Sequence, residues 1–139
     1  MIYLDTSVLG AFFFREPGAR NIVMRLEGQP KGSLIISAWT LTEMASIGEI
    51  KQRTGAIDSG TRQQALANFQ RFASRHLGMT EIEPIDFRTA TVLIDPPTSL
   101  RAGDALRLAV ARRLGARVAS LDKRMIAATE TLGLAQYAF

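Results

Sequence analysis

The chain has 139 residues, of which 47% are hydrophobic and 22% charged, with a net charge of +4 and no cysteine. Residues 1–139 are therefore expected to form one globular domain around a single core. No segment approaches the ~18 consecutive apolar residues of a membrane span, and no basic region precedes the first apolar residues as in a signal peptide, so we expect a cytoplasmic protein without membrane contact. Because cysteine is absent and His76 is the only histidine, a metal could be held only by oxygen ligands.

Positive charge is concentrated in one part of the sequence. Seven of the 17 basic residues lie between positions 101 and 124, the segment that also contains Asp104 and Asp122. This distribution favours a polyanionic partner, although a modest excess of positive charge also serves ordinary solubility.

The first apolar stretch, residues 2–9, is typical of a strand buried on both faces of a parallel sheet, and Asp5 interrupts it. An ionised carboxylate in the middle of such a strand is costly unless it is paired or bound to a metal. We therefore place Asp5 at the carboxyl end of the strand. In open α/β sheets this edge is where ligands bind.

The next segments alternate between helix and strand. In chain order we expect a helix at residues 19–27, a strand at 33–37, a helix at 38–53 and a helix at 61–77 capped by Asp58 or Ser59. Residues 80–85 are a weaker strand candidate, because Pro84 is tolerated only at the end of a strand or in an edge strand.

The last third of the chain repeats this alternation. Asp86 can cap a short helix that ends at Leu93, and the proline-rich residues 95–99 interrupt the chain. We then expect a helix at residues 103–114, a strand at 117–121, a helix from Asp122 to Leu132 and an edge strand at 134–139. Strands that alternate with helices in this way predict an α/β fold of three layers, with a mostly parallel central sheet and helices on both faces.

Three acidic residues have ordinary structural explanations when they are taken singly. Asp5 can cap a turn, Asp104 suits the first turn of a helix, and Asp122 stands where a helix N-cap belongs. Glu43 differs, because at about 100° per residue its direction on the helix falls among apolar residues such as Trp39 and Ile47. A carboxylate on that face needs a partner.

The joint pattern of these acids is more specific than any one of them. Asp5 and Asp122 follow strands, whereas Glu43 and Asp104 lie near the starts of helices that begin at the same edge of the sheet. Four crowded carboxylates repel one another unless a cation neutralises them, and oxygen ligands favour Mg²⁺ or Mn²⁺. Such ions activate water for displacement at phosphorus, so the chemistry requires no side-chain nucleophile.

Other polar residues lie next to these acids. The hydroxyl residues that could orient the carboxylates or a water, or simply stabilise turns, are Thr6, Ser7 and Ser120. The basic candidates for contact with a phosphate backbone are Arg101, Arg107 and Lys123. For Arg107, an exposed solubilising charge on a helix is the alternative.

The ordered set of Asp5-Thr6-Ser7, Glu43, the segment from Arg101 to Leu106 and Ser120-Leu121-Asp122 resembles the PIN-domain ribonucleases. Within that family it is similar to the short VapC-type toxins of bacterial toxin-antitoxin pairs. The similarity spans nearly the whole chain in the right order. Ser120 stands where the family often has threonine, which keeps the hydroxyl, and Arg107 stands where other side chains are frequent.

The resemblance implies a PIN-like fold and a Mg²⁺- or Mn²⁺-dependent endoribonuclease that cleaves single-stranded or looped RNA. It implies a cognate antitoxin that blocks the site, and a homodimer. It also assigns catalytic or metal-binding roles to the matching acids, Asp5, Glu43, Asp104 and Asp122. Asp5 and Asp104 match the two most dependable metal positions.

The sequence also bears on two other classes of function, and it argues against the first of them, another Mg²⁺-dependent phosphoryl-transfer protein. An aspartyl phosphatase would need a second acid where Ser7 stands, and a phosphoacceptor receiver domain would need an aspartate where the strand at 33–37 ends in Ser37. The non-enzymatic alternative is a catalytically silent module that binds RNA or an antitoxin. An RNA-binding surface gains nothing from a buried negative cluster, which argues against this alternative.

Aromatic residues and the histidine are assigned structural roles. His76 lies near a helix C-terminus, where it interacts favourably with the helix dipole. Trp39 and most phenylalanines are expected in the core or at a dimer contact. Residues 12–14 are three consecutive phenylalanines that cannot all face inward, so at least one should be exposed or covered by an antitoxin or a second subunit.

Overall fold

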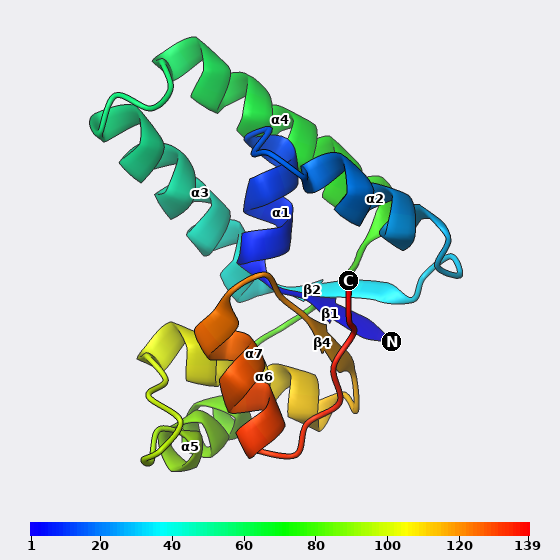
Figure 1. Ribbon diagram of the computed structural model, residues 1–139, viewed down its shortest axis with the longest axis vertical. Coiled ribbons are helices and arrows are strands. Elements are labelled where there is room, and N and C mark those ends of the chain that lie inside the picture. The colour runs from blue at the N-terminus through cyan, green and yellow to red at the C-terminus, as the bar shows by residue number, and fades with distance from the viewer.

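A four-stranded parallel sheet forms the centre of the molecule in the computed structural model, which describes residues 1–139 (Figure 1). The strands are β1 (Ile2–Leu4), β2 (Leu34–Ser37), β3 (Gly78–Thr80) and β4 (Arg117–Ala119). Their order is β3-β2-β1-β4, and every neighbouring pair is parallel. The chain therefore winds outward from β1 in both directions, and a crevice forms at the carboxyl end of a sheet where the winding reverses.

Helices cover both faces of this sheet, as Figure 1 shows. On one face lie α1 (Thr6–Phe13), α2 (Ala19–Glu27), α3 (Ala38–Arg53) and α4 (Ser59–His76). On the other face lie α5 (Pro84–Leu93), α6 (Ala102–Arg113) and α7 (Lys123–Thr131). The predicted three-layer α/β fold is confirmed. None of the helices is both long enough and apolar enough to cross a membrane.

The hydrophobic core is divided by the sheet into two clusters. Ile2 and Leu4 of β1 pack with residues of α1, α3 and α4, whereas Tyr3 packs on the opposite face with residues of α5, α6 and α7. Successive strand residues point to opposite faces, and both faces are covered. This explains why all three residues of β1 are hydrophobic.

The first strand is shorter than predicted. The sequence suggested a strand over residues 2–9, but β1 ends at Leu4 and Thr6 already belongs to α1. Asp5 is the N-cap of α1, and its carboxylate accepts a hydrogen bond from the backbone N–H of Ser7 at 3.4 Å. The N-cap chemistry of the Asp5-Thr6-Ser7 segment thus outweighs the β-propensity of the apolar residues that follow.

Two other strand predictions were wrong. Instead of a strand at residues 80–85, β3 ends at Thr80 and α5 begins at Pro84. Proline suits the first helical position, and Glu83 and Asp86 form a capping box around it, so Asp86 lies inside the first turn rather than at the cap. Residues 134–139 contribute only a single parallel bridge, between Gln136 and Val118.

Asp86 also anchors α5 to α6. Its side chain is 1% exposed and accepts hydrogen bonds from Arg113 Nε at 2.8 Å and Nη2 at 2.9 Å, and from the backbone N–H of Glu83 at 2.8 Å. Burial opposes ionisation, but the hydrogen bonds from Arg113 and Glu83 hold the pKa of Asp86 below its usual value.

The substitution Asp86→Asn should lower the free energy of unfolding by about 3 kcal/mol at pH 7, because it removes the buried one of the two carboxylates that pair with Arg113 and leaves only the exposed Glu83. A carboxyl with a lowered folded-state pKa stabilises the protein above its unfolded pKa, and this stabilisation disappears as the pH falls through the folded pKa. Urea denaturation should therefore show a large difference from wild type at pH 7 and a smaller one in acid.

The matched control is Asp95→Asn, because Asp95 is exposed and its side chain makes no hydrogen bond or ion pair. This variant should unfold at the same urea concentration as the wild type. Equal effects of the two substitutions, or a pH-independent effect of Asp86→Asn, would contradict the assigned role of Asp86.

Candidate active site

The carboxyl ends of β1 and β4 meet at one edge of the sheet and bring the predicted residues together. Asp5 follows β1, and its backbone N–H donates to the carbonyl of Ala119 in β4 at 2.9 Å. Ser120 follows β4 directly. Glu43 reaches this edge from the second turn of α3, and Asp104 from the first turn of α6.

Asp5 is the most buried of the predicted acids, with 1% of its surface exposed. Its Oδ2 accepts hydrogen bonds from Ser120 Oγ at 2.7 Å and from the hydroxyl of Ser7. Its Oδ1 forms an ion pair with the guanidinium of Arg107. Both oxygens of this buried carboxylate are therefore satisfied, one by hydroxyls and the other by a cation.

Glu43 is held in a similar way. Its Oε2 accepts a hydrogen bond from Thr6 Oγ1 at 2.6 Å, and its Oε1 lies 2.9 Å from Arg107 Nη2. Burial raises the pKa of Glu43, the hydrogen bond from Thr6 opposes that rise, and the charge of Asp104 adds to it. Glu43 lies on the apolar side of α3 and has the partners that such a position requires, with 17% of its side chain exposed.

Arg107 lies at the centre of these carboxylates. In addition to its contacts with Asp5 and Glu43, its Nη2 donates to Asp104 Oδ1 at 2.8 Å. Only 12% of the Arg107 side chain is exposed. Burial lowers the pKa of Arg107, but an arginine remains protonated in a protein, so one guanidinium neutralises part of the charge of three carboxylates.

Asp122 lies beside this group rather than in it. It is the N-cap of α7, where its Oδ1 accepts from the backbone N–H of Arg124 at 2.8 Å. Its own N–H donates to Ser120 Oγ at 3.0 Å, which links it to Asp5 through one hydroxyl. Burial raises the pKa of Asp104, and the negative charge of Asp122 adds to this rise.

The donor set has the chemistry of a site for a hard divalent cation, because it offers only carboxylate oxygens. Its arrangement does not fit one as it stands. No three acidic or histidine side chains are placed to hold a metal ion, and the guanidinium of Arg107 lies between the carboxylates that would have to do so. Three of the four acids predicted to converge thus surround an arginine.

Arg107 is largely enclosed, so it is not the exposed solubilising charge that was the alternative for this residue. The other two predicted basic residues are exposed. Arg101 precedes α6 and Lys123 begins α7. Arg124, which the sequence analysis did not select, is also exposed, and its positive charge, like that of Arg101, lowers the pKa of Asp104. Exposed positive charges therefore surround the acids.

Gly103 and Trp39 bring α6 close to α3. A Cβ on Gly103 would lie at ordinary contact distances, 3.4 Å from Trp39 Nε1 and 3.5 Å from Glu43 Oε1, so the two helices are closely packed at this point. The indole N–H of Trp39 is buried without a hydrogen-bond partner, as is the hydroxyl of the neighbouring Thr40. Sequence reasoning assigned Trp39 only to the core or a dimer contact.

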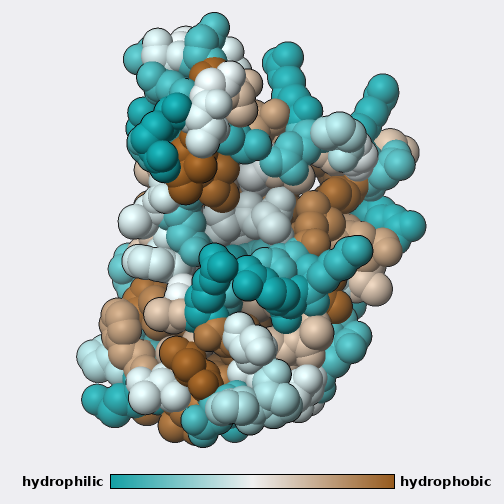
Figure 2. Space-filling view, turned by 60° about the vertical axis from the view of Figure 1, so that its left-hand side comes forward, coloured by the Kyte–Doolittle hydropathy of each residue, from teal (hydrophilic) through white to brown (hydrophobic).

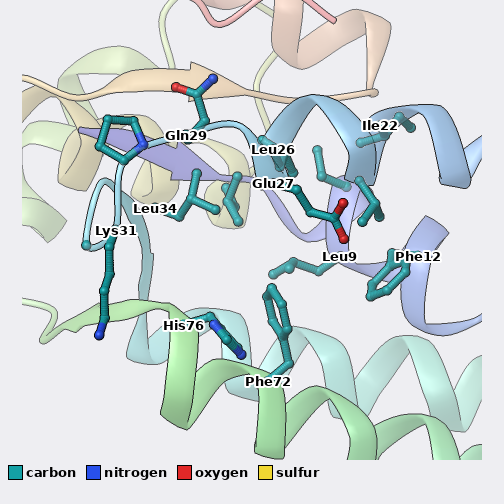
Figure 3. A pocket seen from close by; sticks show the side chains of 15 residues that line it. Leu9, Phe12, Ile22, Leu26, Glu27, Gln29, Lys31, Leu34, Phe72 and His76 are labelled. Atoms are coloured by element: carbon teal, nitrogen blue, oxygen red, sulfur yellow. The ribbon is translucent and has the colours of Figure 1, made fainter.

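A second feature is an apolar cavity of about 510 Å³ between α1, α2 and α4 (Figure 3). Leu9 and Phe12 of α1 and Phe72 of α4 face Ile22 and Leu26 of α2 across it. Phe12 is 36% exposed, whereas Phe13 is buried. The prediction that at least one phenylalanine of residues 12–14 is exposed is confirmed.

Hydrophobic side chains are also exposed on the opposite side of the sheet. Ile85 and Val92 of α5 are 45% and 68% exposed, and they line a shallow groove together with Ala109 of α6. Figure 2 shows hydrophobic surface in separate patches on the upper and lower parts of the molecule, with hydrophilic side chains between them. Exposed apolar groups of this kind are typical of contacts with other proteins.

Comparisons with solved structures identify proteins of the same fold. VapC20 of Mycobacterium tuberculosis, described as a toxin that cleaves the sarcin-ricin loop, is 17% identical, with a TM-score of 0.69 over 92% of this chain and 95% of that one. FitAcB of Neisseria gonorrhoeae is 18% identical, with a TM-score of 0.69 over 99% and 97%. A toxin-antitoxin complex from Klebsiella pneumoniae is 18% identical, with a TM-score of 0.66 over 91% of each chain.

At these identities the neighbours show a shared fold. A comparison with curated protein sequences finds no match. The family model described as PIN domain matches residues 2–130, which include the parallel sheet and all four of the predicted acids. The chain therefore belongs to the PIN-domain family.

Proposed function

We propose that this PIN-domain protein is an endoribonuclease that depends on Mg²⁺ or Mn²⁺ and serves as the toxin of a toxin-antitoxin pair. The observation that carries the proposal is the group of buried carboxylates at the carboxyl edge of the sheet, in a chain of this family. A structural neighbour of the same fold is described as a toxin that cleaves the sarcin-ricin loop, which supports RNA as the substrate.

In this proposal the acids hold the cation and the surrounding basic residues hold the RNA. Asp5, Glu43, Asp104 and Asp122 are the candidate ligands or general base, and a bound divalent ion would supply an activated water and the positive charge needed at the reacting phosphate. Ser120 and Thr6 fix the orientation of Asp5 and Glu43 through the hydrogen bonds described above.

Exposed basic residues beside the acids supply attraction for the phosphate backbone. Arg101, Lys123 and Arg124 are exposed near the cluster, whereas Arg107 is engaged by carboxylates in this conformation. Contacts of this kind with phosphates carry no sequence preference by themselves. They therefore suit the binding of single-stranded or looped RNA, while the choice of cleavage site depends on other contacts.

A catalytically silent RNA-binding module is the second candidate, and the position of Arg107 favours it. A guanidinium among the carboxylates neutralises them without a metal, so the buried acids would not by themselves require a catalytic ion. The two candidates differ in one measurable respect, which is cleavage of RNA that depends on an added divalent cation.

Purified protein should cleave a mixed single-stranded RNA in the presence of Mg²⁺ or Mn²⁺ and stop when EDTA is added. The variants Asp5→Asn and Asp104→Asn should each reduce the cleavage rate by roughly 10²-fold or more, the loss typical for a group that moves a proton or stabilises charge in the transition state. The reaction is followed on a labelled RNA by gel electrophoresis.

The control Asp95→Asn changes the same functional group at an exposed position away from the cluster and should cleave at the wild-type rate. Circular dichroism verifies that each variant is folded. Cleavage that survives either of the two site substitutions would contradict this active site. RNA binding without cleavage under any metal condition would favour the silent module.

An antitoxin partner is supported by a structural neighbour that is described as a toxin-antitoxin complex. We propose that the antitoxin buries apolar side chains in the cavity between α1, α2 and α4, where Phe12 and Ile22 are incompletely covered. The carboxylate of Glu27 reaches into the same cavity, so a basic side chain among the apolar ones would match it (Figure 3).

A homodimer is proposed through the other apolar surface. Ile85 and Val92 are seven positions apart and therefore lie on the same side of α5. An apolar patch can pack against the same patch of a second copy across a two-fold axis, so that each copy covers the exposed side chains of the other. This surface and the antitoxin cavity lie on opposite sides of the sheet, so both contacts can form at once (Figure 1).

The variants Phe12→Ser and Val92→Ser distinguish the two surfaces. Phe12→Ser should raise the antitoxin concentration that half-inhibits cleavage by about tenfold, as expected for truncation of an apolar anchor, and leave the oligomeric state unchanged. Val92→Ser should shift the molar mass measured by light scattering toward the monomer and leave inhibition unchanged. The reverse pattern, or no effect of either variant, would show that the surfaces are assigned incorrectly.

A further inference from the structure

In Asp5 and Glu43, one carboxylate oxygen contacts a hydroxyl group and the other contacts Arg107. Asp5 directs Oδ2 to Ser120 at 2.7 Å and Oδ1 to the guanidinium. Glu43 directs Oε2 to Thr6 at 2.6 Å and Oε1 to the guanidinium at 2.9 Å. The outer oxygens of Asp5 and Glu43 are thus held by hydroxyl groups, and their inner oxygens face one positively charged group, as does Oδ1 of Asp104.

A divalent ion would need those same inner oxygens. Mg²⁺ lies about 2.0–2.1 Å from its ligands. Arg107 Nη2 already lies 2.9 Å from Glu43 Oε1 and 2.8 Å from Asp104 Oδ1, and the other terminal nitrogen contacts Asp5. There is no room for the ion and the guanidinium between these oxygens at the same time.

We propose that Arg107 is a built-in competitor of the divalent cation, whose guanidinium takes the place of the ion among Asp5, Glu43 and Asp104 and must leave before the ion binds. This inference rests on the metal-dependent part of the proposed function. It assigns Arg107 a role distinct from substrate contact, because the side chain sets how much free cation the site requires.

The physical reason for such a group is the charge of the metal-free protein. Three partly buried carboxylates without a cation would repel one another and lose their hydration. Arg107 supplies the positive charge from α6, the same helix that carries Asp104. An arginine cannot avoid the competition by losing its proton, so the ion always has to displace a charged group.

The test is a titration with Mn²⁺, in which free ion is measured by electron paramagnetic resonance and no RNA is present. Arg107→Met removes the charge and keeps an unbranched side chain of similar length. It should bind Mn²⁺ about tenfold more tightly or more, because the apparent affinity of the wild type is reduced by the small fraction of molecules in which the site is open.

Arg101→Met is the matched control for the loss of one nearby positive charge. Arg101 is exposed, and its charge acts on Asp104, but it does not lie between the carboxylates. This variant should bind Mn²⁺ with nearly the wild-type affinity. If both variants gain affinity equally, the effect is general electrostatics and the proposed competition is wrong.

Other outcomes are equally decisive. Unchanged or weaker binding by Arg107→Met overturns the inference and leaves the nuclease proposal intact, whereas no Mn²⁺ binding by any variant overturns both. If Arg107→Met is unfolded without metal, recovery of its circular dichroism with Mn²⁺ supports the inference, since the ion then replaces the guanidinium. If Mn²⁺ does not restore it, Arg107→Gln decides, because glutamine removes the charge and keeps a hydrogen-bond donor for the carboxylates: tighter binding than wild type supports the inference, and equal or weaker binding overturns it.

Discussion

The contact between the Asp5 carboxylate and the Arg107 guanidinium is the interaction on which the rest of the site depends. Asp5 is almost fully buried at the end of the central strand, where an ionised carboxylate is stable only with a cation and hydrogen-bond donors. Removing one partner of a buried ion pair costs about 3–5 kcal/mol, because the remaining charge loses both water and its partner. The ion pair is therefore a structural element of the metal-free protein.

The fold concentrates negative charge at this edge for reasons of backbone geometry. The parallel strands β1 and β4 end side by side, and the helices that follow them begin there. Asp5 and Asp122 cap α1 and α7, and Asp104 lies in the first turn of α6. The positive ends of the helix dipoles stabilise each carboxylate separately, so the acids can be brought together at a smaller cost than their mutual repulsion suggests.

Much of the architecture could be predicted from the sequence because local signals agreed with the packing. The limits of α2 and α3 were predicted as they occur, and Asp58 was identified as a candidate N-cap of α4. Predictions failed where two local signals competed. The apolar run at the N-terminus has β-propensity throughout, but the cap at Asp5 ends the strand after Leu4.

The candidate site could be predicted in part, since helical spacing identified Glu43 as an acid on an apolar face that needs a partner, and topology placed the acids at one edge. The arrangement of the carboxylates around Arg107 could not be predicted. Spacing showed that Arg107 and Asp104 share a side of α6, but whether that side faces solvent or the sheet depends on the rotation of the helix, which is a tertiary property. A lone arginine beside acidic residues is compatible with both orientations.

Competition between Arg107 and a divalent ion requires that Asp5, Glu43 and Asp104 form a cation site. A crystal structure of the protein with Mn²⁺, with the ion located by its anomalous scattering, tests this requirement. We expect an anomalous peak among these three carboxylates, with the Arg107 side chain turned away from them. A peak elsewhere, or none while Arg107 keeps its contacts at saturating Mn²⁺, would contradict the proposed competition.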